Sequence, residues 1–218
     1  MSRRTSAVLS LLSCVSVGLF LVLAIGVSSS GALNELVVRM DAVLVRQAFY
    51  LPSPSHFLVA FMVAVTHLAD PLVVATFEIL VFILLISLRR RTLAVSFAVG
   101  LTIGVAITQV LKILIERGRP ADVIYQVSRI GYSFPSGHTV AAMIFYGFAG
   151  YTLAHVAARR WQKYSIAVAT TLIVLLVGYS RLFLGVHWLS DVLGGWLFGG
   201  AVLILIILGY EAMRKRLA

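Results

Sequence analysis

Three short polar segments in an otherwise apolar chain carry the residue types that handle phosphate. They read Lys112-x6-Arg119-Pro120, then Pro135-Ser136-Gly137-His138, then Ser180-Arg181-x5-His187-x3-Asp191. Together they hold three cations, two histidines, serine hydroxyls and one carboxylate. Cationic side chains neutralise phosphoryl oxygens, and a neutral imidazole can attack phosphorus. The set therefore predicts phosphoryl transfer through a histidine nucleophile.

The third segment supplies the predicted nucleophile. His187 and Asp191 are four residues apart at the start of a helical stretch, which places them on one helical face. A carboxylate bonded to one imidazole nitrogen fixes the tautomer and leaves the other nitrogen free to attack. We therefore predict that His187 attacks phosphorus while Asp191 stabilises the charge that develops on the ring. The alternative is a buried polar pair that only holds the helix end.

The remaining polar residues are predicted to bind the phosphoryl group. Positive charge comes from Lys112, Arg119 and Arg181. Each of these is also typical of a span end, where long cationic side chains reach toward water. Ser136 and Gly137 open a predicted helix, whose N-terminal amides attract anions, although a plain helix cap would have the same sequence. His138 follows directly and is placed to protonate the leaving oxygen.

The order and internal spacing of the three segments resemble the tripartite signature of the type 2 phosphatidic acid phosphatase superfamily of membrane lipid phosphatases. The resemblance covers residues 112–191. It implies a phosphohistidine intermediate, a second histidine that acts as general acid and later assists water, and no metal or other cofactor. It implies catalytic roles for His187, His138 and Asp191, phosphate binding by Lys112, Arg119, Ser136, Gly137 and Arg181, and supporting roles for Pro120, Pro135 and Ser180.

The elements that position these segments are predicted to be membrane-spanning helices. The chain has 218 residues, of which 61% are hydrophobic and only 12% charged, and this is too apolar for an ordinary water-soluble domain. Apolar runs of about 18 residues or more can cross a bilayer, and in lipid they form helices. We predict an all-α bundle of six transmembrane helices in one domain, 1–218, with a motif-bearing core at about 93–210. The predicted spans are 6–28, 71–88, 93–115, 137–157, 165–178 extending toward 183, and 192–210.

An interfacial amphipathic helix is predicted between the first two spans. Three charged residues spaced by four and seven share one helical face: Glu35, Arg39 and Arg46. The opposite face is apolar, and Pro52 and Pro54 end the helix. This pattern is typical of a helix lying in the membrane surface.

The stretch 57–65 is apolar but short. It is flanked by His56 and His67, so we predict a helix that dips into the membrane and not a seventh span. Asp70 followed by Pro71 predicts the start of the second span, with the Asp70 side chain capping the free amides.

Basic clusters predict the orientation. With six spans, four clusters fall on one side, which the positive-inside tendency makes cytoplasmic. They are Arg3 and Arg4, then Arg89 to Arg91, then Arg159, Arg160 and Lys163, and last Arg214, Lys215 and Arg216. Both termini are then cytoplasmic, and the polar segments face the periplasm or the exterior. Because this clustering accounts for the net charge of +10, the expected partners are the bilayer and a lipid phosphate, with no nucleic acid.

Five other residues have weaker claims. Glu78 lies about two turns into the second span, where an acid is costly. We predict that it pairs with a polar neighbour or acts in substrate admission or proton movement. Arg117, Arg129, Tyr125 and Tyr132 lie in or beside the outer loop, either contacting the headgroup or anchoring the interface.

These features predict a metal-independent lipid phosphatase of a bacterial inner or plasma membrane. By family analogy, undecaprenyl diphosphate is the first choice of substrate, with phosphatidylglycerophosphate, phosphatidate and lipid A phosphates as alternatives. A lipid phosphotransferase has the same motifs, and competition by acceptor alcohols would distinguish it. A transporter is disfavoured because transporter sites lie near the membrane midplane. A non-catalytic binding protein is disfavoured because every motif residue is present.

Overall fold

In the computed structural model, the described residues 2–49, 55–120 and 131–217 form eight helices and no strand. The predicted all-α class is therefore confirmed for this part of the chain. The helices are α1 (Arg3–Ser28), α2 (Ala32–Phe49), α3 (His56–His67), α4 (Pro71–Ser87), α5 (Arg91–Ile115), α6 (Gly137–Val156), α7 (Arg160–Phe183) and α8 (Leu189–Leu217).

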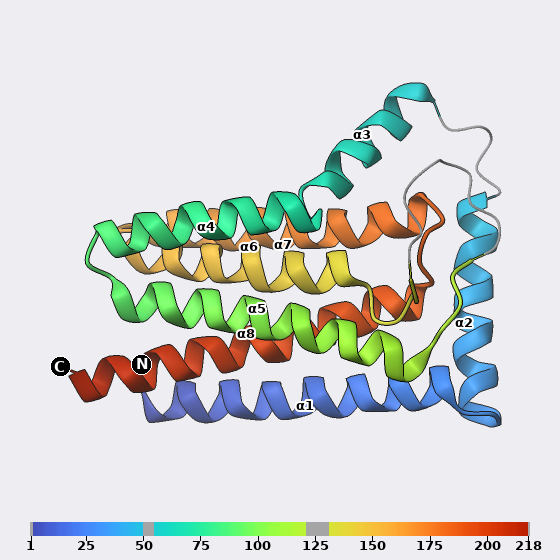
Figure 1. Cartoon of the computed structure of the whole chain (residues 1–218), viewed down its shortest axis with the longest axis horizontal. Coiled ribbons are helices and arrows are strands. Elements are labelled where there is room, and N and C mark those ends of the chain that lie inside the picture. Colours follow the sequence, from blue (N-terminus) through green and yellow to red (C-terminus); the bar gives the residue numbers. More distant parts are fainter. Residues whose placement is uncertain (1, 50–54, 121–130, 218) are drawn as a thin grey trace.

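Helices α1, α4, α5, α6, α7 and α8 run along the long axis of the molecule (Figure 1). Both ends of the chain lie at one end of this bundle, together with the α4–α5 and α6–α7 turns. At the other end, α2 crosses the bundle and α3 inclines away from it. Helix α8 packs against α1, α5 and α6. The polar segments lie in the α5–α6 and α7–α8 connections and in the adjoining helix ends, which are toward the α2 end of the bundle (Figure 1).

Five helices are long and apolar enough to cross a membrane: α1, α5, α6, α7 and α8. Helices α3 and α4 are long enough to cross a membrane only when they are taken together, and the pair is bent by 48° at the short break between them. The bundle thus has five candidate spans, or six if the bent pair is one span. The predicted six-span count and the dipping of residues 57–65 stay predictions.

The centre of the bundle is built from aromatic and small side chains. Phe97 and Phe148 stack with ring centroids 4.7 Å apart, and each is 1% exposed. A Cβ at Gly195 would lie 2.8 Å from Thr139 Cβ and 3.0 Å from the Ser136 carbonyl oxygen. Glycine at this position therefore allows α8 to approach the beginning of α6 closely.

Helix α2 turns an unexpected face toward the bundle. Val37 and Asp41 are each 2% exposed, whereas Leu36 and Val43 are more than half exposed. The spacing of four between Val37 and Asp41 puts both on one face. The buried face therefore includes an acid, and the interfacial placement of α2 stays a prediction.

The prediction that Asp70 caps α4 is wrong. Pro71 does occupy the first turn, and Asp70 stands at the N-cap position, but its side chain makes no capping hydrogen bond. Its two carboxylate oxygens contact His67 and His138 instead. Imidazole partners from α3 and α6 have displaced the local amides, which the sequence around Asp70 does not indicate.

Candidate active site

The three polar segments meet around one end of a large cavity that is lined mainly by residues of α4, α5 and α6. Helix α5 ends, and α6 begins, toward the end of the bundle that α2 crosses (Figure 1). The cavity has a volume of about 1080 Å³. Its polar end is lined by Asp70, Lys112, Arg119, His138, Arg181 and His187. Lys112 and Arg119 thus line the same cavity.

His187 lies in the connection between α7 and α8 and is only 3% exposed. Its Nδ1 is 3.1 Å from Asp191 Oδ2, an oxygen that also accepts the Trp188 amide at 3.0 Å. On the other side of the ring, Arg119 Nη1 is 3.3 Å from Nε2. Because arginine only donates, Nε2 must accept, and the ring proton belongs on Nδ1. A nucleophilic Nε2 requires this tautomer.

The surroundings of His187 keep its imidazole neutral. Burial is the main reason that the pKa of His187 is lowered to about 3. The hydrogen bond and charge of Asp191 oppose this shift, while Arg181 and Arg119 add to it. At neutral pH the ring therefore carries a lone pair on Nε2.

On the side away from His187, Asp191 belongs to a network of charged residues that extends to α2. Arg117 donates to Asp191 and to Asp41, and both carboxylates are almost completely buried. Asp41 also accepts the Ser190 amide at 2.9 Å and the Ser190 hydroxyl at 2.8 Å. The network ties α2 to the start of α8. Arg117, expected at the headgroup or the interface, binds two buried carboxylates instead.

Backbone carbonyl groups orient two of the cations. Lys112 Nζ donates to the Tyr132 carbonyl oxygen at 2.6 Å. Arg119 donates from Nε to Gly131 at 2.9 Å and from Nη1 to Val186 at 3.0 Å. A carbonyl group orients a cation without neutralising it, so Lys112 can still attract an anion into the cavity.

Arg181 has a donor ready for a ligand. The residue is 3% exposed, and its Nη1 donates to Thr66 Oγ1 at 2.6 Å. Its Nε is buried and has no hydrogen-bond partner among the described residues. A buried donor left without a partner costs about 1–3 kcal/mol, and a phosphoryl oxygen in the cavity would relieve that cost.

Ser136 and Gly137 begin α6 beside the cavity. Ser136 stands at the N-cap position, but its hydroxyl makes no capping bond and accepts from Thr139 Oγ1 at 2.9 Å. Gly137 lines the cavity, and a Cβ there would face Lys112 Cε at 3.9 Å. Glycine therefore keeps this part of the cavity open beside the free amides of the helix.

His138 is paired with a residue outside the three segments. Its Nε2 is 2.8 Å from Asp70 Oδ1, and the other oxygen of Asp70 contacts Nδ1 of His67. The His138 side chain is 18% exposed and lines the cavity. This position is suitable for the predicted general acid, because His138 lines the cavity and no hydrogen-bond partner of its Nδ1 is found within residues 2–49, 55–120 and 131–217.

The far part of the cavity is mainly apolar. It is lined there by Leu72, Val74, Ala75, Leu101, Val105 and Ala106. Glu78 also lines it and accepts a hydrogen bond from Thr102 at 3.3 Å, so the predicted polar neighbour of Glu78 is found. A cavity that is cationic at one end and apolar beyond it suits a phosphate attached to a hydrocarbon chain.

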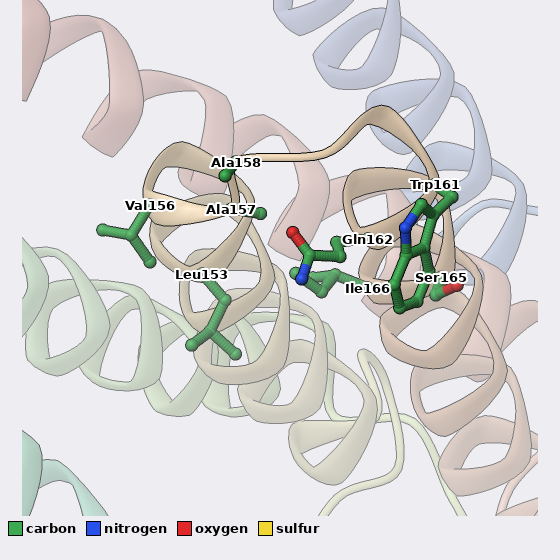
Figure 2. A pocket seen from close by; sticks show the side chains of 8 residues that line it. All are labelled: Leu153, Val156, Ala157, Ala158, Trp161, Gln162, Ser165 and Ile166. Carbon is green, nitrogen blue, oxygen red and sulfur yellow. The ribbon is translucent and has the colours of Figure 1, made fainter.

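A second cavity, shown in Figure 2, lies at the α6–α7 turn, at the opposite end of the bundle. It has a volume of about 530 Å³ and is lined by Leu153, Val156, Ala157, Ala158, Trp161, Gln162, Ser165 and Ile166. The described lining contains no histidine, acid or cation. The residues predicted to handle phosphate line the first cavity and not this one.

The supporting motif residues shape the backbone. Ser180 is buried, and its hydroxyl donates to a carbonyl of α7. Pro120 is buried directly after Arg119, and a cis peptide bond precedes Pro135. Arg129 and Tyr125, which were expected near the headgroup, lie outside the described residues.

Sequence reasoning missed three contributors: Asp41, His67 and the carboxylate role of Asp70. Asp41 had a signal, since an acid four residues after Val37 lies on an otherwise apolar helical face and needs a buried partner. Asp70 had no comparable signal in the sequence, because an aspartate before a proline is a common helix start. The role of His67 depends on its contact with Asp70, so it was missed for the same reason.

Comparison with known proteins gives matches over much of this chain. A family model described as PAP2 superfamily matches residues 93–215. Phosphatidylglycerophosphatase B of Bacillus subtilis is 38% identical over 111 residues, which are 50% of this chain and 54% of that protein. Undecaprenyl-diphosphatase of Sulfolobus acidocaldarius is 26% identical over 130 residues, which are 57% of this chain and 59% of that protein. The chain thus matches little more than half the length of these curated relatives.

One solved structure is similar over nearly the whole chain. The transmembrane PAP2-type phosphatidylglycerolphosphate phosphatase of Bacillus subtilis superposes with a TM-score of 0.79, covering 94% of this chain and 97% of that one. At 24% sequence identity, this likeness concerns the fold.

Proposed function

The chain belongs to the PAP2 superfamily, and from this membership we propose that it hydrolyses a lipid phosphate or lipid diphosphate through a phosphohistidine. The family match extends beyond the three polar segments in which the resemblance was first seen. The observation that carries the proposal is the His187–Asp191 pair, whose Nε2 faces a cation at the polar end of a partly apolar cavity.

In the first step, Nε2 of His187 attacks phosphorus and the bond from phosphorus to the lipid-side oxygen breaks. His138 donates its Nδ1 proton to that oxygen, and the Nδ1 proton of His187 stays bonded to Asp191. In the resting site Arg119 Nη1 contacts Nε2 of His187. When substrate is bound, the same N–H group donates its hydrogen bond to a phosphoryl oxygen instead. Together with Lys112, Arg119 stabilises the charge on the equatorial oxygens.

In the second step, water attacks the phosphohistidine. His138, now neutral, accepts a proton from that water, the phosphorus–nitrogen bond breaks, and His187 returns to its starting state. Inorganic phosphate leaves the polar end of the cavity. One water molecule is consumed for each phosphate released, and the chain ends the cycle unchanged.

Two substrate classes come first. Relatives of this chain are named phosphatidylglycerophosphatase and undecaprenyl-diphosphatase, and these names supply the two leading substrates. The sequence favoured undecaprenyl diphosphate, and that choice stays a proposal beside phosphatidylglycerophosphate. Either lipid would place its phosphate among the cations and its chain along the apolar lining.

The cavity is proposed to open toward the outer leaflet of a bacterial membrane. In support, both chain ends and the α4–α5 and α6–α7 turns, near which the four basic clusters lie, are at the end of the bundle far from the cavity (Figure 1). By the positive-inside tendency that end is cytoplasmic. In this arrangement the chain is one domain of six spans, with α2 in the outer interface.

The test is phosphate release by detergent-purified protein, with EDTA present. The substrates are undecaprenyl diphosphate, phosphatidylglycerophosphate and phosphatidate. We expect release that survives EDTA and is abolished in His187→Ala, while His56→Gln, an exposed change outside the cavity, retains it. Substantial hydrolysis by His187→Ala would rule out the phosphohistidine. Release from none of the lipids would overturn the proposed activity.

A further inference from the structure

The turn between α3 and α4 places a carboxylate between two histidines. Asp70 Oδ1 is 2.8 Å from His138 Nε2, and Asp70 Oδ2 contacts His67 Nδ1. The side chain of His67 is 60% exposed, that of Asp70 31% and that of His138 18%. The three side chains therefore form a line from the surface of the protein to the wall of the cavity.

This turn is held in place from two other helices. Tyr146 of α6 donates its hydroxyl to the Leu68 carbonyl oxygen at 2.8 Å. Arg181 of α7 donates to Thr66, the residue before His67. Because Asp70 makes no capping bond to α4, its carboxylate is committed to the histidines. The position of Asp70 beside His138 is therefore built into the packing of four helices.

The cations around His138 disfavour its protonated form, and the carboxylate of Asp70 opposes this effect. Lys112, Arg119 and Arg181 line the same cavity, and all three disfavour a protonated imidazole nearby. A general acid must nevertheless carry a proton when the substrate is bound. A carboxylate hydrogen-bonded to Nε2 favours the protonated ring and leaves Nδ1 as the nitrogen that reaches the substrate.

We propose that Asp70 is a positioning residue that favours the protonated form of His138 and orients it for leaving-group protonation, and that His67 holds Asp70 in that orientation. The inference rests on the proposed phosphatase function. Both residues precede residue 93, where the family match begins, so they lie outside the matched region. The site then has two aspartate–histidine pairs, one for the nucleophile and one for the acid.

The experiment compares two leaving groups in the purified full-length protein. Phosphatidate releases a diacylglycerol alkoxide, which needs a proton, whereas p-nitrophenyl phosphate releases p-nitrophenolate, which is stable without one. General acids contribute about 10²–10⁴-fold to such reactions. We expect Asp70→Asn to lower kcat on phosphatidate by about 100-fold and on p-nitrophenyl phosphate by less than about 5-fold. His67→Gln should show the same selectivity with a smaller loss, and His56→Gln should show no loss.

A double variant tests whether Asp70 acts through His138. If it does, Asp70→Asn adds little to His138→Ala on phosphatidate, because coupled residues are not additive. Equal losses on both substrates with unchanged Tm, or full additivity with His138→Ala, would overturn the inference. Wild-type turnover of lipid phosphates reports separately on the proposed function, so the two hypotheses can fail independently.

Discussion

The two histidines of the site are each paired with an aspartate, but in opposite surroundings. His187 and Asp191 are buried, and Arg117, Ser190 and Asp41 hold Asp191 from behind. His138 lines an open cavity, and its partner Asp70 lies on a partly exposed turn beside His67. The proposed nucleophile is thus fixed by a closed charge network, and the proposed acid by a short chain of contacts leading to the surface.

The difference agrees with what each histidine has to do. A nucleophile must present one tautomer in one orientation, and buried hydrogen-bonded ion pairs impose such a geometry. A general acid must gain and lose a proton in every cycle, which is easier beside solvent and a counter-charge. In both pairs, the aspartate is supported from outside by a residue that precedes the family-matched region, Asp41 for the first pair and His67 for the second.

The largest effect on turnover is expected for Asp191→Asn, which tests the different roles of the two aspartate–histidine pairs. We expect kcat to fall by about 10³-fold or more on every substrate, because the imidazole loses the group that fixes its tautomer and stabilises its positive charge. The loss should not depend on the leaving group, unlike that of Asp70→Asn. Steady-state kinetics on phosphatidate and p-nitrophenyl phosphate would measure it, and a loss confined to phosphatidate would contradict the division of roles.

A smaller effect is expected at Asp41, which touches no substrate. Asp41→Asn leaves Arg117 with one buried carboxylate in place of two, so Asp191 should be held less firmly. We expect kcat to fall about 10-fold on both substrates with little change in KM. Glu35→Gln is the matched control, since Glu35 lies exposed on the same helix. Equal behaviour of the two variants would show that α2 does not support the nucleophile.

The smallest effect concerns stability and pH. Because the pKa of His187 is lowered to about 3 by burial, the unfolded state binds a proton at pH 5 that the folded state does not. The free energy of unfolding should therefore fall by roughly 2 kcal/mol from pH 6.5 to pH 5 through this residue. His187→Gln should reduce the drop in Tm over this range by roughly 5 °C, and His56→Gln should not. An unchanged drop in His187→Gln would indicate that the ring is protonated when folded.

The sequence predicted the parts of the site that local pattern controls. The spacing of His187 and Asp191, and the helix start at Gly137, depend on residues a few positions apart. Long apolar runs predicted the helices, although the run expected from residue 165 begins at Arg160. The number of spans was less predictable. Helix α4 alone is too short to count as a candidate span, and the bend between α3 and α4 depends on packing.

What could not be predicted depends on contacts between distant segments. Asp70 looks like a helix cap in its own sequence, yet its partner His138 is 68 residues away. Arg117 looks like an interface anchor, yet it lies between two acids from different helices. A charged side chain takes the partner that burial requires, and that partner is set by the folded bundle.

The bond between Asp41 and Ser190 joins residues 149 positions apart, and it bears on how the protein is made. During synthesis, α1 and α2 emerge first and must wait for almost the whole chain before α8 arrives to meet them. Until then Asp191, Arg117 and Asp41 cannot come together. A nascent or half-inserted chain therefore lacks the assembled site, and the proposed hydrolysis requires completed membrane integration.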